Sequence, residues 1–232
     1  MKLQKNTLSS QVKEVLLDRI LKGKYKPGDA LVELTIAKEL GVSQAPVREA
    51  FQALESMRFV ETGPNRRTRV RLITNKEMSE GTLVRGFLEE SAAKLAAPYL
   101  KDHIAELQAE LDGMSLAYNA VDRDALIVSA VQFHRLIVAA CGNNVLLEVW
   151  ESLAYEAKSR IYARKIAHEM LALGITYHQE ILDAFKAGDG ALASRLLRNM
   201  AERGAKFQLE TPQGEVDEQA EDAVRAEQKA AQ

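Results

Sequence analysis

An almost unbroken helical periodicity over roughly the last two thirds of the 232-residue chain leaves few folds open to it. From about Lys76 onward, apolar residues recur every three or four positions, the spacing of helices that bury one face. Helix-breaking residues divide this pattern at Pro98, Gly142-Asn143 and Gly188-Asp189-Gly190. We therefore predict helical segments near 77–97, 102–119, 122–141, 144–165, 168–187 and 189–209. Five of these six are long enough, and apolar enough on one face, to form an antiparallel helical bundle.

Residues 1–75 carry a different pattern, in which shorter segments alternate with turns. We predict helices over about 7–22, 33–40 and 44–57, and strands over 59–62 and 68–72. Between the second and third helices, Gly41 suits the left-handed conformation that ends a helix, and Ser43 is placed to cap the next one. Three helices followed by a basic hairpin outline a winged helix-turn-helix with a two-stranded wing. The predicted fold class is mainly α, with this domain preceding the helical bundle.

Charge divides the chain in the same place. Residues 1–75 contain 14 Lys and Arg against 8 Asp and Glu, a net charge of +6, whereas residues 76–232 contain 17 against 25, a net charge of −8. A basic module attached to an acidic remainder suits a domain that faces a polyanion such as nucleic acid. The alternative is an uneven distribution of solvated surface charges that has no partner.

Composition excludes several classes of protein. Hydrophobic residues make up 47% of the chain and charged residues 28%, the balance of a folded soluble protein rather than a disordered one. A single cysteine, Cys141, excludes an internal disulfide framework and a cysteine-based zinc cluster. Polar residues that include His134 and Arg135 interrupt the longest apolar stretch, and residues 1–7 lack the apolar core of a signal peptide. We expect a cytoplasmic protein with no membrane segment.

The third helix of the N-terminal domain, over about 44–57, is the second helix of the helix-turn-helix pair. In such motifs that helix enters the major groove, so it is the candidate for reading DNA. Arg48 stands one turn into it, where a guanidinium can reach two acceptors of a guanine. Gln44 can read adenine or a phosphate, and Ser43 offers a hydroxyl and a helix N-terminal N–H to the DNA backbone. The wing supplies four more candidates for phosphates or a narrow minor groove: Asn65, Arg66, Arg67 and Arg69. In the alternative, Arg48 pairs with Gln52 or Glu55 and has no role on DNA.

Two runs of residues in this domain carry a family resemblance. They are Gly23-x-Tyr25-x-Pro27-Gly28 and Ala37-x-x-Leu40-Gly41-Val42-Ser43-Gln44-Ala45-Pro46-Val47-Arg48-Glu49-Ala50. Together they resemble the N-terminal domain of GntR-family transcriptional regulators, over about residues 7–72. The resemblance implies a double-stranded DNA operator as a partner. Many members carry Arg where this chain has Gln44, so the resemblance does not extend to the identity of the operator bases.

Softer motifs follow in the helical region. They are Arg85-x-x-Leu88-Glu89, Phe133-His134-x-x-Ile137, Cys141-Gly142-Asn143 and His178-x-x-Ile181-Leu182. In this order they resemble the all-helical FCD-type effector domain of the FadR subfamily. The resemblance implies a homodimer that responds to a small ligand. The predicted domains are therefore a DNA-binding domain over 1–75, an effector-binding and dimerisation domain over 76–209 and an acidic tail over 210–232.

Many members of that subfamily hold a divalent metal with one Asp and three His, and the resemblance places the corresponding positions here at Ala130, His134, His178 and Met200. Two of the four expected ligands are replaced, and a methionine thioether is a poor substitute for an imidazole. One alternative is a weakly bound divalent metal on His134 and His178, completed by water or an effector carboxylate. The other, which the missing ligands favour, is a metal-free anion pocket.

Periodicity independently places several of these side chains on apolar helical faces. His134 and His178 each share a stripe with aliphatic residues, and the stripe through Trp150 leads at three-four spacing to Arg160 and Arg164. A guanidinium that faces a bundle interior is costly unless it meets an anion. The predicted effector-binding residues are Arg85, His134, Arg160, Arg164 and His178, for a carboxylate or phosphate. The alternatives are satisfied core histidines and arginines that reach back to water.

The sequence thus predicts a homodimeric transcriptional regulator that binds a two-fold symmetric operator under the control of a small organic acid. A helical-bundle enzyme with a histidine-bound metal is the first alternative, which the missing ligands and the lack of paired carboxylates oppose. A DNA-bridging protein without an effector is the second.

Overall fold

The computed structural model describes residues 7–63 and 67–211. Asn65 and Arg66 of the predicted wing, and almost all of the predicted acidic tail, lie outside the described residues. The described chain divides into two compact units, and the boundary along the sequence lies between Thr74 and Asn75. Each unit has a core of its own, so each is treated by itself.

Three helices form most of the N-terminal unit: α1 (Leu8–Leu21), α2 (Glu33–Leu40) and α3 (Gln44–Ser56). The hydroxyl of Thr7 accepts a hydrogen bond from the backbone N–H of Ser10 and caps α1. Gly41 ends α2 with a φ of 67°, the left-handed conformation that was predicted for it. Ser43 precedes α3 as predicted, but its side chain makes no capping hydrogen bond to the backbone of that helix. The predicted side-chain cap is therefore wrong.

The wing contains one strand more than the sequence predicts. β2 (Val60–Thr62) and β3 (Thr68–Val70) form the expected antiparallel hairpin, and β1 (Ala30–Leu31) pairs with the other edge of β3. The sheet order within the described residues is therefore β1-β3-β2. A two-residue strand shows no alternation of apolar and polar residues, which is why periodicity could not find it.

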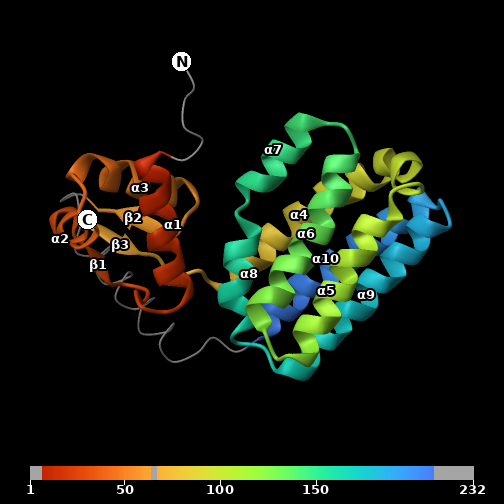
Figure 1. Ribbon diagram of the computed structural model, residues 1–232. Helices are drawn as coiled ribbons and strands as arrows, with labels where there is room; N and C mark the ends of the chain where they lie inside the picture. Colours follow the sequence, from red (N-terminus) through yellow and green to blue (C-terminus); the bar gives the residue numbers. More distant parts are fainter. Residues whose placement is uncertain (1–6, 64–66, 212–232) are drawn as a thin grey trace, which may run out of the picture. The chain divides into compact units, whose positions relative to one another are not determined.

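The second unit is an all-helical bundle (Figure 1). Its helices are α4 (Asn75–Leu100), α5 (Ile104–Asn119), α6 (Arg123–Ala140), α7 (Asn144–Ser152), α8 (Tyr155–Ala163), α9 (His168–Lys186) and α10 (Gly190–Glu210). The long helix α4 packs along α10 and also contacts α6, while α5 packs on α6 and α9. Fully buried aromatic and aliphatic side chains fill the space between them, including Phe133, Ile137, Ile181 and Phe185. No helix of residues 7–63 or 67–211 is long and apolar enough to cross a membrane.

Two helix boundaries differ from the predictions. Pro98 lies inside α4 rather than ending it, and the helix ends two residues later at Leu100, so that the proline interrupts only its last turn. The predicted helix 144–165 is two helices, with Ala154 between them at a φ of 49°. This break ends the apolar stripe that passes through Trp150, so Arg160 does not continue it.

The close packing of α4 on α10 predicts a sharp difference between two glycines of α4. A methyl group at Gly86 would overlap the methyl of Ala201, whereas one at Gly81 would meet no atom within 4 Å. Gly86→Ala should lower the free energy of unfolding of the bundle by about 1–3 kcal/mol through overpacking. Gly81→Ala should raise it by up to about 1 kcal/mol through helix propensity. Urea denaturation followed by circular dichroism measures both, and equal effects would contradict the packing.

Candidate functional site

The predicted DNA-reading residues share the exposed face of α3. Val47 and Leu54 are buried on the other face, and Ser43, Gln44 and Arg48 face solvent. Arg48 remains 62% exposed while its Nε and Nη2 donate to the two carboxylate oxygens of Glu33 on α2, at 3.2 and 2.9 Å. The partner of Arg48 is therefore Glu33 rather than Gln52 or Glu55, which the alternative interpretation proposed.

The described wing residues have unequal exposure. Arg67 is exposed, whereas Arg69 is half-buried and its Nη1 donates to the carbonyl of Gly28 at 2.9 Å. This bond ties β3 to the turn that precedes β1. Glu55, at the end of α3, accepts from the backbone N–H of Thr62 at 2.9 Å and fixes the hairpin to that helix. The structure thus assigns Arg69 a contact within the protein and leaves Arg67 facing solvent.

A cavity of about 190 Å³ lies inside the helical bundle, and we call it the central cavity. Five of the residues singled out from the sequence line it: Arg85, Ala130, His134, His178 and Met200. The structure therefore brings together four positions that the family resemblance connected, although they come from α6, α9 and α10. The remaining lining is mostly apolar side chains of α5, α6, α8, α9 and α10.

Arg160 and Arg164 do not line the central cavity, which corrects their prediction as effector-binding residues. Arg160 donates through Nε and Nη2 to the carboxylate of Asp124 at 3.2 and 3.1 Å, and Nη2 of Arg164 lies 3.8 Å from the same group. The physical reason is the break at Ala154, which gives α8 its own orientation and turns these guanidinium groups toward the start of α6.

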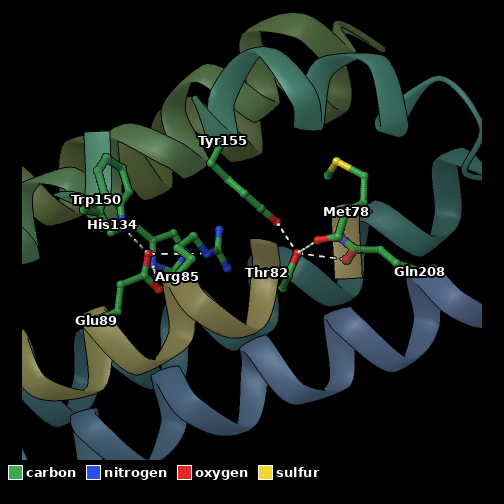
Figure 2. Close-up of polar contacts among 8 residues, drawn as sticks. All are labelled: Met78, Thr82, Arg85, Glu89, His134, Trp150, Tyr155 and Gln208. Carbon is green, nitrogen blue, oxygen red and sulfur yellow. Dashed lines mark hydrogen bonds and ion pairs between the residues drawn. The ribbon is translucent and has the colours of Figure 1, made fainter. Parts of the chain in front are cut away.

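A buried carboxylate that the sequence analysis did not single out organises one side of the cavity. Glu89 is fully buried and accepts from Trp150 Nε1 at 2.9 Å. Its Oε1 lies 3.4 Å from Nε of Arg85 and its Oε2 lies 3.0 Å from Nδ1 of His134, as Figure 2 shows. The spacing of four between Arg85 and Glu89 on one helix was the signal that could have revealed the pair.

Glu89 is ionised in the folded protein. Burial alone raises the pKa of its carboxyl, but the charge of Arg85 and the contact with His134 outweigh burial and lower the pKa to about 2. Burial also lowers the pKa of His134, although the charge of Glu89 opposes this. A neutral His134 next to a carboxylate carries its proton on Nδ1, so its Nε2 presents a lone pair.

His178 is also neutral and also carries its proton on Nδ1, but a different contact fixes it there. Its Nδ1 lies 2.6 Å from the carbonyl of Gly174, an acceptor, so this nitrogen carries the proton. Burial, with the neighbouring His134, lowers the pKa of His178 to about 3, and the ring is neutral. The Nε2 atoms of His134 and His178 are both buried without a hydrogen-bond partner among the described residues. The two rings lie 4.9 Å apart, centre to centre.

The residues present do not fit the four-ligand metal site that the resemblance suggested. Two imidazole nitrogens with oriented second partners are half of such a site. Ala130 offers no donor atom, Met200 offers only a soft thioether, and Glu89 is already held by three side chains. Within residues 7–63 and 67–211, no group of three or more His, Cys, Asp or Glu side chains could hold a metal ion.

Polar residues of α4, α8 and α10 complete the lining, and the sequence analysis missed them. The ring of Tyr155 lies over Arg85, 4.1 Å from the guanidinium carbon, and its hydroxyl lies 3.4 Å from that of Thr82. Thr82 in turn donates to Gln208 at 2.8 Å (Figure 2). The hydroxyl of Ser159 is buried and has no hydrogen-bond partner in the part of the chain that the structure describes. These residues lie on polar or mixed faces that helical periodicity does not distinguish from surface.

Comparison with known proteins adds to this geometry. The model described as "Bacterial regulatory proteins, gntR family" matches residues 8–70, and the model described as "FCD domain" matches residues 81–203. The chain is 33% identical over 196 residues to the probable D-xylose utilization operon transcriptional repressor of Paenarthrobacter nicotinovorans, covering 84% of this chain and 86% of that protein. It is 28% identical over 196 residues to the gluconate operon transcriptional repressor of Bacillus subtilis, covering 82% and 80%.

Solved structures of regulators are similar to this chain over most of its length. Escherichia coli McbR/YncC has a TM-score of 0.73 at 25% identity, covering 88% of this chain and 98% of that one. A GntR transcriptional regulator from Rhodococcus sp. RHA1, described as putative in its title, has a TM-score of 0.75 at 27% identity, covering 88% and 99%.

The Glu89 contacts predict a large cost for removing one buried charge. Glu89→Gln leaves Arg85 buried without a counterion, so it should lower the free energy of unfolding by about 3–5 kcal/mol. The neighbouring Glu90 pairs with Arg198 at the partly exposed surface, and Glu90→Gln should cost at most about 1 kcal/mol. Urea denaturation of both variants gives the comparison, and similar losses would refute a special role for Glu89.

The same groups predict that the helical domain loses stability in acid. Because the pKa of Glu89 falls from 4.5 to about 2 on folding, its contribution is complete above pH 4.5 and is lost as the pH falls toward 2. Because the pKa of His178 falls from 6.5 to about 3, the unfolded chain gains that proton first, and a second loss begins near pH 6.5. Urea midpoints measured from pH 8 to pH 4 should decline below pH 6.5. A midpoint that is constant down to pH 5 would contradict a buried neutral His178.

Proposed function

The chain belongs to the GntR family of bacterial regulatory proteins, and we propose that it binds operator DNA as a homodimer of the FadR subfamily under the control of a small effector. It is a transcriptional regulator rather than an enzyme, as the names of its relatives indicate. Relatives named as repressors support repression as the direction of control. We place its action in the cytoplasm, where the operator DNA lies.

The observation that carries the DNA-binding half is the exposed N-terminal face of α3. Ser43, Gln44 and Arg48 project from it, while the opposite face is packed into the domain core. The ion pair with Glu33 holds the guanidinium of Arg48 extended in solvent, which reduces the side-chain entropy lost when it reaches a base. A guanine offers this guanidinium two acceptors in the major groove. Arg67 is the described wing residue best placed for phosphate contacts.

The observation that carries the effector half is the pair of unpartnered imidazole nitrogens in the central cavity. A buried acceptor without a partner costs folding free energy, so a ligand that supplies donors gains affinity there. The sequence predicted a small organic acid as that ligand. Two relatives are named for D-xylose and gluconate operons, which supports an effector derived from a carbohydrate.

Dimerisation would link the two halves. Large apolar side chains of α4, among them Phe87, Leu95 and Tyr99, are exposed on the described chain, which supports a contact with a second copy. Two copies would present two copies of α3 to a two-fold symmetric operator. An effector can change operator affinity only to the extent that it binds one arrangement of the two reading helices better than the other.

Operator binding tests the role of Arg48. On an operator selected from a randomised duplex library with the wild-type chain, Arg48→Ala should weaken binding by about 1–3 kcal/mol, since a bidentate base contact is lost, and should relax the preference at one base pair. Arg195→Ala removes another exposed arginine, on α10, and should leave affinity and preference unchanged. Titration by fluorescence anisotropy measures both. Equal behaviour of the two variants would refute base reading by Arg48.

A further inference from the structure

The fixed charges around the central cavity are balanced before any ligand arrives. Among the described residues that line it, Arg85 is the only one with a permanent charge. The carboxylate of Glu89 lies 3.4 Å from Nε of Arg85, and both side chains are almost completely buried. The face of Tyr155 covers the same guanidinium. The cation that the sequence assigned to an anionic effector is therefore already neutralised by the protein.

A second negative charge would be costly in this place. A carboxylate that entered the cavity would share one guanidinium with Glu89, whose own carboxylate is buried beside it. The titratable groups that face the site are Arg85 and Glu89 of α4, His134 of α6, Tyr155 and Tyr162 of α8 and His178 of α9. Of these, one of the histidines would have to take up a proton to restore the balance, which burial of both rings opposes.

The hydrogen-bonding groups that lack partners point to the same class of ligand. Among the described buried atoms without a hydrogen-bond partner, Nε of Arg85 can only donate. Nε2 of His134 and Nε2 of His178 are acceptors, because their Nδ1 atoms lie 3.0 Å from Oε2 of Glu89 and 2.6 Å from the carbonyl of Gly174. An ionised carboxylate or phosphate has only acceptors and cannot bond to them. A hydroxyl group donates, and the unpartnered hydroxyl of Ser159 can serve a further hydroxyl in either direction.

We propose that the central cavity binds an uncharged polyhydroxylated molecule, a sugar or a polyol, whose hydroxyl groups donate to His134 and His178 and whose oxygens accept from Arg85. The apolar lining from Ile127 and Leu171 suits the C–H faces of such a ligand. This assignment rests on the proposed function and narrows it. It replaces the organic acid that the sequence predicted.

The test is a matched panel on the full-length chain after dialysis against a chelator. The uncharged series contains glycerol, D-xylose, xylitol and D-glucose, and the acid series contains their counterparts glycerate, D-xylonate and D-gluconate. We expect at least one uncharged member to raise the melting temperature and its acid counterpart to have no effect. Calorimetry of the bound member in two buffers of different ionisation enthalpy should give the same heat, because no proton is taken up.

Two other results overturn the proposal. An acid that binds while its uncharged counterpart does not would exclude the uncharged class. If that acid also releases the selected operator, the regulator assignment stands and only the ligand class fails. A panel in which no member of either series stabilises the chain also counts against the proposal, and operator binding in the same samples shows that the DNA-binding assignment is unaffected.

A serine variant separates ligand binding from folding. Ser159→Ala removes a hydroxyl with no partner among the described residues, so the variant should fold with unchanged stability. It should bind the stabilising sugar or polyol about tenfold more weakly, the equivalent of one lost hydrogen bond. Ser152→Ala, at an exposed position of α7, should bind it as the wild type does. Equal affinities of the two variants would remove Ser159 from the site.

Discussion

The ionised carboxylate of Glu89 is the interaction on which the helical domain depends. One buried group joins three helices, since it accepts from Trp150 of α7, lies against His134 of α6 and balances Arg85 on its own helix α4. A charge in a protein interior is tolerated when it is paired, and here Oε1 accepts from Trp150 and lies 3.4 Å from Nε of Arg85, while Oε2 lies 3.0 Å from Nδ1 of His134. The same contacts neutralise Arg85 and orient the ring of His134, both of which line the central cavity. The groups that stabilise the helical domain therefore also determine which ligand the cavity accepts.

The two domains use charge in opposite ways. The N-terminal domain keeps the guanidinium of Arg48 in solvent, where it is positioned by Glu33 but remains available to a polyanion. The helical domain buries a guanidinium and neutralises it, and the cavity then presents two imidazole nitrogens that can only accept. Such a regulator would bind DNA through exposed positive charge and would select its effector by whether the effector donates hydrogen bonds to the cavity.

Most of the architecture could be predicted from the sequence because helices and turns are local. The spacing of apolar residues and the glycines and prolines between them indicated the bundle and the three N-terminal helices, with the left-handed Gly41 at its predicted place. The errors occur where a local pattern carries no information. The two residues of β1 are too few to show a period, and the break at Ala154 uses a residue that favours helices.

The sequence by itself determined the family, the exposed face of α3 and some of the positions that line the cavity, among them His134 and His178, since each follows from spacing along one helix or from a motif. Only the tertiary structure decided the long-range partners: Glu33 for Arg48, Asp124 for Arg160 and Glu89 for His134. The reason is physical. Which face of a helix is buried follows from its own period, but which charges meet between helices, and which nitrogen of His134 keeps its lone pair, depend on residues far away in the chain.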